Sequence, residues 1–207
     1  MTFKTVAAAL VGASVMVGAA GAAQAAFVSP TSVTWENNGS VTDANRTNTN
    51  NVMVQDGKFL SLGVGGWAVF DFGYERAASA NDGVVVETTF NCVTANDGNC
   101  TYSEEADVYV ATSWDGSYAA GTPLTGATWT KIASIPNGLA QGGFSFTIPE
   151  AFRYIALLDT STKQVDGFDV DYIAVTPLPA AAWFMLTALG GLVGGRWLRK
   201  GRAAQAA

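Results

Sequence analysis

The chain has 207 residues, enough for one domain of ordinary size, and its middle is strongly acidic. Residues 26–176 hold 6 basic and all 17 acidic residues, a net charge of −11 against −6 for the whole chain. Such a charge argues against a nucleic-acid partner, because phosphate binding needs clustered Lys and Arg. The absence of histidine excludes a Ser-His-Asp triad, a Cys-His dyad and every metal site with histidine ligands.

Residues 1–25 have the pattern of a secretory signal peptide. Lys4 supplies a positive start, and residues 6–20 form an uncharged run of apolar and small side chains. Ala23 and Ala25 place small side chains at the two positions that signal peptidase reads, which predicts cleavage before Ala26. The alternative is an uncleaved N-terminal anchor, which the short run rich in Ala and Gly disfavours.

Residues 26–175 are predicted to form one all-β domain, an antiparallel β-sandwich. No convincing amphipathic helix is found there, and short β-branched and aromatic runs are separated by Gly, Asn, Asp and Pro clusters. The predicted strands are 32–35, 52–54, 59–62, 67–72, 84–90, 106–112, 128–135, 144–148, 152–158 and 168–175. Most of the aromatic side chains are expected in the core of this domain.

Two cysteines, Cys92 and Cys100, bracket a turn-rich segment in the middle of the domain. In an exported protein, thiols this close in sequence are expected to form a disulfide that staples a hairpin-like loop. The alternative is a redox-active or metal-binding pair. The spacing is not CxxC, and no other Cys or His is present to complete a metal site.

Trp114 and Tyr118 lie in one turn, 113–118, and are the best candidates for aromatic side chains that stack on a sugar ring. The alternative is that they pack in the core or are incidentally exposed. Structural burial of both would remove this reason for predicting a carbohydrate site.

Asp166, Asp169 and Asp171 form the sharpest group of candidate metal ligands. On a strand, Asp169 and Asp171 point to the same face, with Asp166 in the preceding turn. Carboxylates placed this way repel one another, and a bound Ca²⁺ would relieve the repulsion. The alternative is a solvated edge strand whose charges prevent aggregation.

The C-terminal segment has the composition of a membrane helix. Residues 179–195 carry no charge and are strongly apolar, and a helix of this length just spans the core of a bilayer. Four basic residues follow at once, and the positive-inside rule then places the folded domain outside the cytoplasm. The alternative is a buried helix of the domain. The basic residues are Arg196, Arg199, Lys200 and Arg202.

This tail resembles the sorting tails of the PEP-CTERM class, in particular the VPLPA variety, over about 30 residues. The matching motif consists of Thr176, Pro177, Leu178, Pro179 and Ala180, followed by the apolar run and the basic end. Thr176 stands where this family usually has Val. The resemblance therefore does not define which peptide bond is cleaved. The resemblance implies that a membrane-embedded exosortase cuts near the motif and passes the protein to the cell surface or extracellular polymer layer.

Three further stretches also resemble known proteins. Residues 59–73, with their SLGVGG run, resemble a segment common in surface proteins with such tails. Residues 107–116 followed by 129–133 resemble a run of galactose-binding-like jelly rolls, and residues 166–173 resemble the closing strand of the same fold. The resemblance implies a jelly-roll sandwich, and in carbohydrate-binding members the Asp before the Tyr of the closing strand, here Asp171, often helps to hold structural Ca²⁺.

Together these observations predict an exosortase-sorted surface or extracellular-matrix protein with a non-enzymatic structural or binding role. Its expected partners are signal peptidase, the exosortase, the membrane through residues 179–195, and extracellular polysaccharide. The first alternative is a calcium-stabilised carbohydrate-binding module. The second is a small glycoside hydrolase, which would require two carboxyl groups that converge in a pocket.

Overall fold

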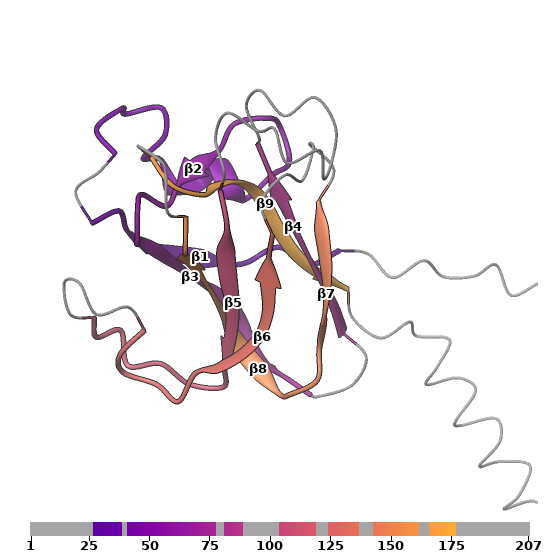
Figure 1. Ribbon diagram of the computed structural model, residues 1–207. Coiled ribbons are helices and arrows are strands. Elements are labelled where there is room, and N and C mark those ends of the chain that lie inside the picture. Colours follow the sequence, from indigo (N-terminus) through magenta and orange to yellow (C-terminus); the bar gives the residue numbers. More distant parts are fainter. Residues whose placement is uncertain are drawn as a thin grey trace, which may run out of the picture.

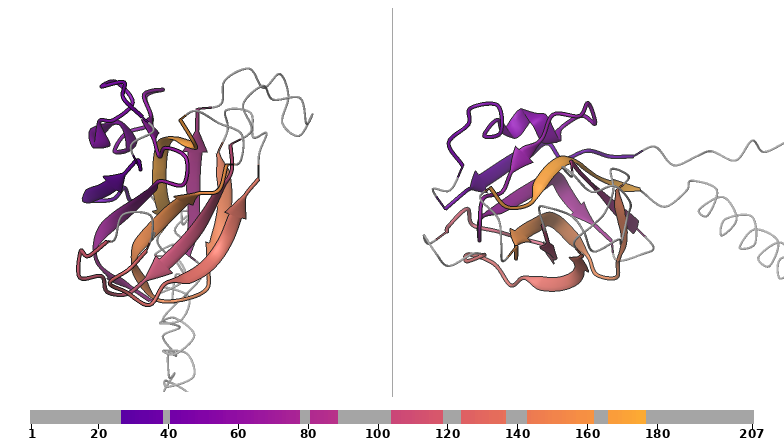
Figure 2. Two further views of the ribbon diagram at one scale, coloured as in Figure 1. Left: turned by 60° about the vertical axis from the view of Figure 1, so that its left-hand side comes forward. Right: turned by 45° about the horizontal axis from the view of Figure 1, so that its top comes forward.

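The computed structural model describes residues 27–38, 41–77, 81–88, 104–118, 124–136, 143–161 and 166–176, drawn in colour in Figure 1. In this part of the chain two antiparallel sheets pack face to face, as the left view of Figure 2 shows. The all-β sandwich predicted from the alternation of apolar and turn-forming runs is therefore confirmed.

The first sheet has five strands in the order β1-β3-β8-β5-β6. Its long central strands carry alternating side chains, and the inward set of β5 (Val108 and Val110) is fully buried. The strands are β1 (Ser32–Glu36), β3 (Trp67–Arg76), β8 (Phe152–Asp159), β5 (Ala106–Ala111) and β6 (Thr130–Ile135).

The second sheet has four strands in the order β2-β9-β4-β7. Its ladder between β4 and β9 is regular from Asp82 to Val86 and then shifts register between Val86 and Glu87. The strands are β2 (Leu60–Ser61), β9 (Asp169–Thr176), β4 (Asn81–Glu87) and β7 (Phe144–Ile148).

The core lies between the two sheets and is made of aliphatic and phenylalanine side chains. Phe70, Phe72 and Phe152 from the first sheet meet Ile148 and Ile173 from the second, and all five are almost completely buried. Burial of such side chains is the main favourable term in folding and contributes roughly 1.5–3 kcal/mol for each.

One predicted strand, 52–54, is wrong. The chain forms the 3₁₀ helix η1 (Thr49–Val52) and bends after it. The cause is local, because the Asn48 side chain accepts a hydrogen bond from the backbone N–H of Asn50 and caps the turn. Val52 is still fully buried, so its hydrophobicity serves the core from a turn instead of a strand.

Several predictions concern residues outside the described part of the chain. They are the signal cleavage at Ala23, Ala25 and Ala26, the Cys92–Cys100 disulfide, the motif residues Pro177, Leu178, Pro179 and Ala180, and the basic residues Arg196, Arg199, Lys200 and Arg202. Thr176, the first residue of the motif, is the last residue of β9. Among the residues described, no helix has the length and apolar character needed to cross a bilayer.

Candidate functional site

Trp114 belongs to a packed aromatic cluster on the outer face of the five-stranded sheet. Its ring centroid lies 6.2 Å from that of Trp67, 6.5 Å from that of Trp129 and 6.1 Å from that of Tyr154. Its Nε1–H donates to the carbonyl oxygens of Thr125, at 2.9 Å, and Ser117, at 3.2 Å. Trp114 therefore packs and closes its own loop.

Tyr118 completes this aromatic cluster but lies at its surface. Its ring centroid is 5.4 Å from that of Trp67 in an edge-on arrangement. Tyr118 is 52% exposed, whereas Trp67 is 4% exposed. Of the two predicted sugar-stacking residues, one has a structural role and the other presents an open ring.

The three aspartates predicted to bind metal have three different sets of partners. Asp166 forms an ion pair with Arg46, and Asp169 accepts a hydrogen bond from the hydroxyl of Ser61. Asp171 accepts backbone N–H groups of Asp56, at 3.3 Å, and Gly57, at 3.2 Å. They do not converge, and the described residues contain no group of three acidic, Cys or His side chains placed to hold a metal ion.

The expected common face of Asp169 and Asp171 is lost because the register shift in the β4–β9 ladder falls beside them. Strict alternation would have kept them on one face. The edge-strand alternative is wrong as well, since β9 lies between β2 and β4 and both aspartates are buried. The three aspartates therefore do not together form the Ca²⁺ site predicted from their spacing.

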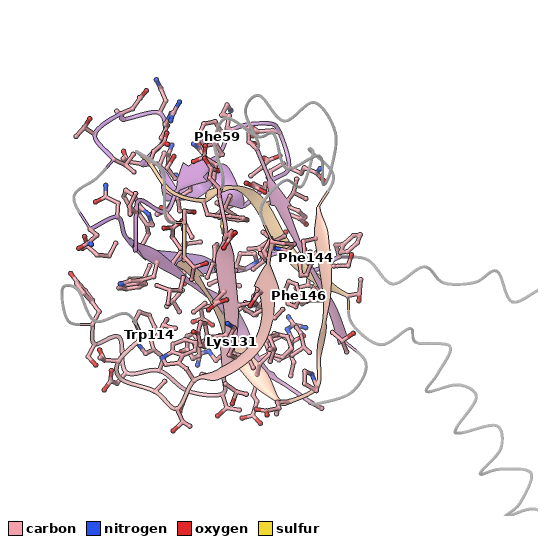
Figure 3. The ribbon with its side chains drawn as sticks, viewed as in Figure 1. Phe59, Trp114, Lys131, Phe144 and Phe146 are labelled. Carbon is pink, nitrogen blue, oxygen red and sulfur yellow. The ribbon has the colours of Figure 1, made fainter. Side chains whose placement is uncertain are left out.

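An open pocket of about 580 Å³, here the loop pocket, lies beside η1 and the start of β2. Most of its lining is polar, with one aromatic ring. It is lined by Asp43, Ala44, Asn45, Arg46, Asn48, Asn51, Gly57, Lys58 and Phe59. Phe59 is at the opposite end of the sandwich from Trp114 (Figure 3).

The walls of the loop pocket are held from behind by hydrogen bonds. The buried amide of Asn51 donates to the carbonyl oxygens of Asn45, at 2.8 Å, and Phe59, at 2.7 Å, which ties the two walls together. The Arg46 guanidinium lies 5.3 Å from the Phe59 ring centroid. Asp166 orients this guanidinium, and Asp171 holds the backbone of Gly57. Two of the predicted metal ligands therefore brace the pocket.

A second group of carboxyls, here the carboxyl cluster, is buried close by. It consists of Glu87 at the end of β4, Glu104 before β5, Asp159 at the end of β8 and Asp169 at the start of β9. Their exposed fractions are 3%, 3%, 3% and 1%. Only Asp169 was a sequence candidate, because the other three are far apart in the chain and no local pattern connects them.

Burial and mutual repulsion change the acidity of this cluster. The pKa of Glu104 is raised to about 8, mainly because burial desolvates its carboxyl and next because the charge of Glu87 lies nearby. Desolvation, then the charge of Glu104, raises the pKa of Asp169 to about 8, against the opposing effects of Ser61 and Arg46. Burial also raises the pKa of Asp159. Carboxyls in such a setting hold protons near neutral pH.

Asp159 also joins two glycine-containing loops. Its carboxylate accepts the backbone N–H groups of Gly65, at 2.8 Å, and Phe168, at 2.9 Å, and the hydroxyl of Ser161, at 2.6 Å. The loops approach closely, because a Cβ on Gly167 would lie 2.5 Å from the carbonyl carbon and oxygen of Gly63. Gly167 has φ of +69°, which favours glycine.

Comparisons with solved structures give the class of fold. The chain is similar to the CBM32 domain of AlyQ in complex with 4,5-unsaturated mannuronic acid, at 14% identity and a TM-score of 0.50, over 72% of this chain and 97% of that domain. A truncated AlyQ with CBM32 and alginate lyase domains matches at 13% identity and a TM-score of 0.51, over 73% of this chain and 33% of that one.

The described domain is thus a CBM32-like β-sandwich at very low sequence identity, and the likeness shows the fold alone. No protein-family model matches the sequence. The comparison with curated proteins gives no match either.

Proposed function

We propose that this chain is an exported, non-enzymatic carbohydrate-binding module whose sugar site is the loop pocket. The observation that carries the proposal is the composition of this pocket, in which an aromatic ring, amides and two cationic side chains surround an open cavity of about 580 Å³. Small-molecule sites commonly have roughly this volume and a few convergent polar groups. The CBM32-like fold supports the same conclusion.

The chemistry of the lining suits a ring that carries many hydroxyls. Asp43 offers a carboxylate acceptor, Asn48 an amide, and Lys58 and Arg46 offer N–H donors. Phe59 supplies an apolar surface for the C–H face of a sugar. Because Asn51 and Asp166 already fix the walls, little conformational entropy is lost on binding.

The pocket fits binding better than hydrolysis. Glycoside hydrolases ordinarily use two carboxyl groups that flank the scissile bond. Among the described residues that line the loop pocket, Asp43 is the one carboxylate. The carboxyl cluster supplies no substitute, since its members are buried beneath the surface.

The exported setting and exosortase sorting rest on the two ends of the chain and stay predictions of the sequence. We propose that the mature protein runs from Ala26 to about Pro179 and resides at the cell surface or in the matrix. Intact mass of protein recovered from the envelope and the medium tests both cleavages at once. A full-length mass in both fractions would contradict them.

A glycan array that carries neutral, amino-sugar and uronate oligosaccharides, probed with the full chain, tests the binding function. For any oligosaccharide that binds, Phe59→Leu and Lys58→Met should each weaken the affinity at least tenfold, about 1.4 kcal/mol. Leu keeps apolar bulk but removes the flat ring, and the Lys58 side chain is 70% exposed, so that both variants should fold.

The matched control is Lys131→Met. Lys131 is also an exposed lysine in an ion pair, with Asp107 at 2.7 Å, but lies on β6 outside the pocket. Its loss should leave affinity unchanged. If Tyr118→Ala abolished binding and Phe59→Leu did not, the sugar site would belong to the aromatic cluster instead. Absence of binding across the array would refute the proposed function.

A further inference from the structure

We infer that the carboxyl cluster retains protons near neutral pH. This protonation makes both the stability of the sandwich and the shape of the loop pocket depend on pH. The effect on stability follows from the cluster alone. The effect on sugar affinity rests on the proposed function, so the two are measured separately.

The geometry requires protons inside the cluster. Four carboxyls from β4, β8, β9 and the segment before β5 are each at most 3% exposed. The charge of Glu87 acts on the Glu104 carboxyl and opposes its ionisation, which favours a proton on one of the two groups. Oε2 of Glu104 and Oδ2 of Asp169 are buried without a hydrogen-bond partner among the described residues. Full ionisation would leave several unsolvated negative charges side by side.

Within the described part of the chain, few charged groups act on the cluster. The charged groups that act on Glu104 are Glu87 and Asp159, and those that act on Asp169 are Glu104, Asp159 and Arg46. Arg46 is the one cation among them, and it already pairs with Asp166. Among the described residues, proton retention is therefore the way to limit the negative charge, in agreement with pKa values of about 8 for Glu104 and Asp169.

The cluster is connected to the loop pocket through β2. The Ser61 hydroxyl donates to Asp169, and the Ser61 backbone N–H donates to the carbonyl oxygen of Arg46 at 2.9 Å. Arg46 lines the pocket and lies over Phe59. Repulsion within an ionised cluster thus acts on the strand that carries the pocket wall.

The sign of the stability effect follows from linkage. In the unfolded chain these carboxyls have pKa values of about 4, so between about pH 4 and pH 8 the native state binds more protons than the unfolded state. The stabilisation is complete below the unfolded value and is lost progressively as the pH rises towards about 8. For each proton retained, the unfolding equilibrium constant rises about tenfold per pH unit in this window.

The first test is denaturant unfolding of the full chain from pH 5 to pH 8.5, beside Glu104→Gln and Asp169→Asn. Wild type should show at least the tenfold rise per pH unit, and each variant should lose about one factor of ten per pH unit, because its amide is uncharged at every pH and binds no proton. Glu105→Gln is the matched control, because Glu105 is adjacent in sequence but exposed, and it should keep the wild-type slope.

Two further measurements need no variant that might fail to fold. Infrared spectra of wild type at pH 6.5 should show the C=O stretch of protonated carboxylic acids, which disappears as the pH passes through about 8. Affinity for a bound oligosaccharide should fall severalfold from pH 6.5 to pH 9.

Three results would overturn this inference. They are an unfolding equilibrium constant of wild type that does not change with pH, a wild-type infrared spectrum without protonated carboxyls, or loss of the pH dependence when added Ca²⁺ replaces the protons. If no oligosaccharide binds at any pH, the proposed function fails, while the unfolding and infrared results still test whether the cluster retains protons.

Discussion

The end of the sandwich that carries the loop pocket and the end that carries Trp114 are stabilised in different ways (Figure 3). The pocket end is stabilised by hydrogen bonds and an ion pair. Asn51 connects two loops, Asp166 orients Arg46, and Asp159 joins two glycine-containing loops. At the other end, rings pack on rings, and the Trp114 indole closes its loop with two hydrogen bonds.

The difference shows which end is suited to binding. Directional hydrogen bonds keep a cavity open, because they fix the residues of each wall to the protein beneath, so that the walls do not pack against each other. Aromatic packing fills space and leaves only Tyr118 well exposed. An exposed aromatic in a turn was the sequence signal for a sugar site, yet the described pocket formed where the sequence is rich in Asn and Asp.

The largest expected loss of stability comes from a substitution at the aromatic end. Trp114→Ala removes a ring that contacts Trp67, Trp129 and Tyr154. It should lower the free energy of unfolding by about 3 kcal/mol, the lower part of the range for a large aromatic side chain, since Trp114 is only partly buried. Denaturant unfolding measures this loss.

The same variant separates structure from binding. Under conditions where Trp114→Ala remains folded, its affinity for an oligosaccharide should equal that of wild type. A variant that kept its stability but lost affinity would reverse the comparison between the two ends and restore Trp114 as a ligand-binding residue.

Much of the fold could be read from the sequence because strand periodicity is local. Alternation in 106–112 and the aromatic run in 67–72 placed β5 and β3 correctly, although β3 continues to Arg76. The 52–54 prediction failed because Val52 serves the core from a capped turn, whereas Val54 is exposed. Propensity describes side-chain preference and does not detect an Asn cap that overrides it.

The site was harder to predict because its parts are distant in sequence. The aspartates of 166–171 were recognised as a group, but their partners Arg46, Ser61 and Gly57 lie more than a hundred residues away. The register shift beside Asp171 also has no sequence mark. Glu87 offered one faint signal, an acidic residue that directly continues a run of three valines. Such a residue in a buried strand needs a partner or a proton.

A smaller effect is expected from the close approach of the two loops at the pocket end. Gly167→Ala should cost about 2 kcal/mol, from the left-handed backbone and from a Cβ 2.5 Å from the Gly63 backbone. Gly116→Ala, at the aromatic end, is the matched control, since Gly116 also has a positive φ, +80°, but no atom within 4 Å of its Cβ. It should cost about 1 kcal/mol. Unfolding of both variants isolates the contact, and equal losses would show that the approach of the loops contributes nothing to stability.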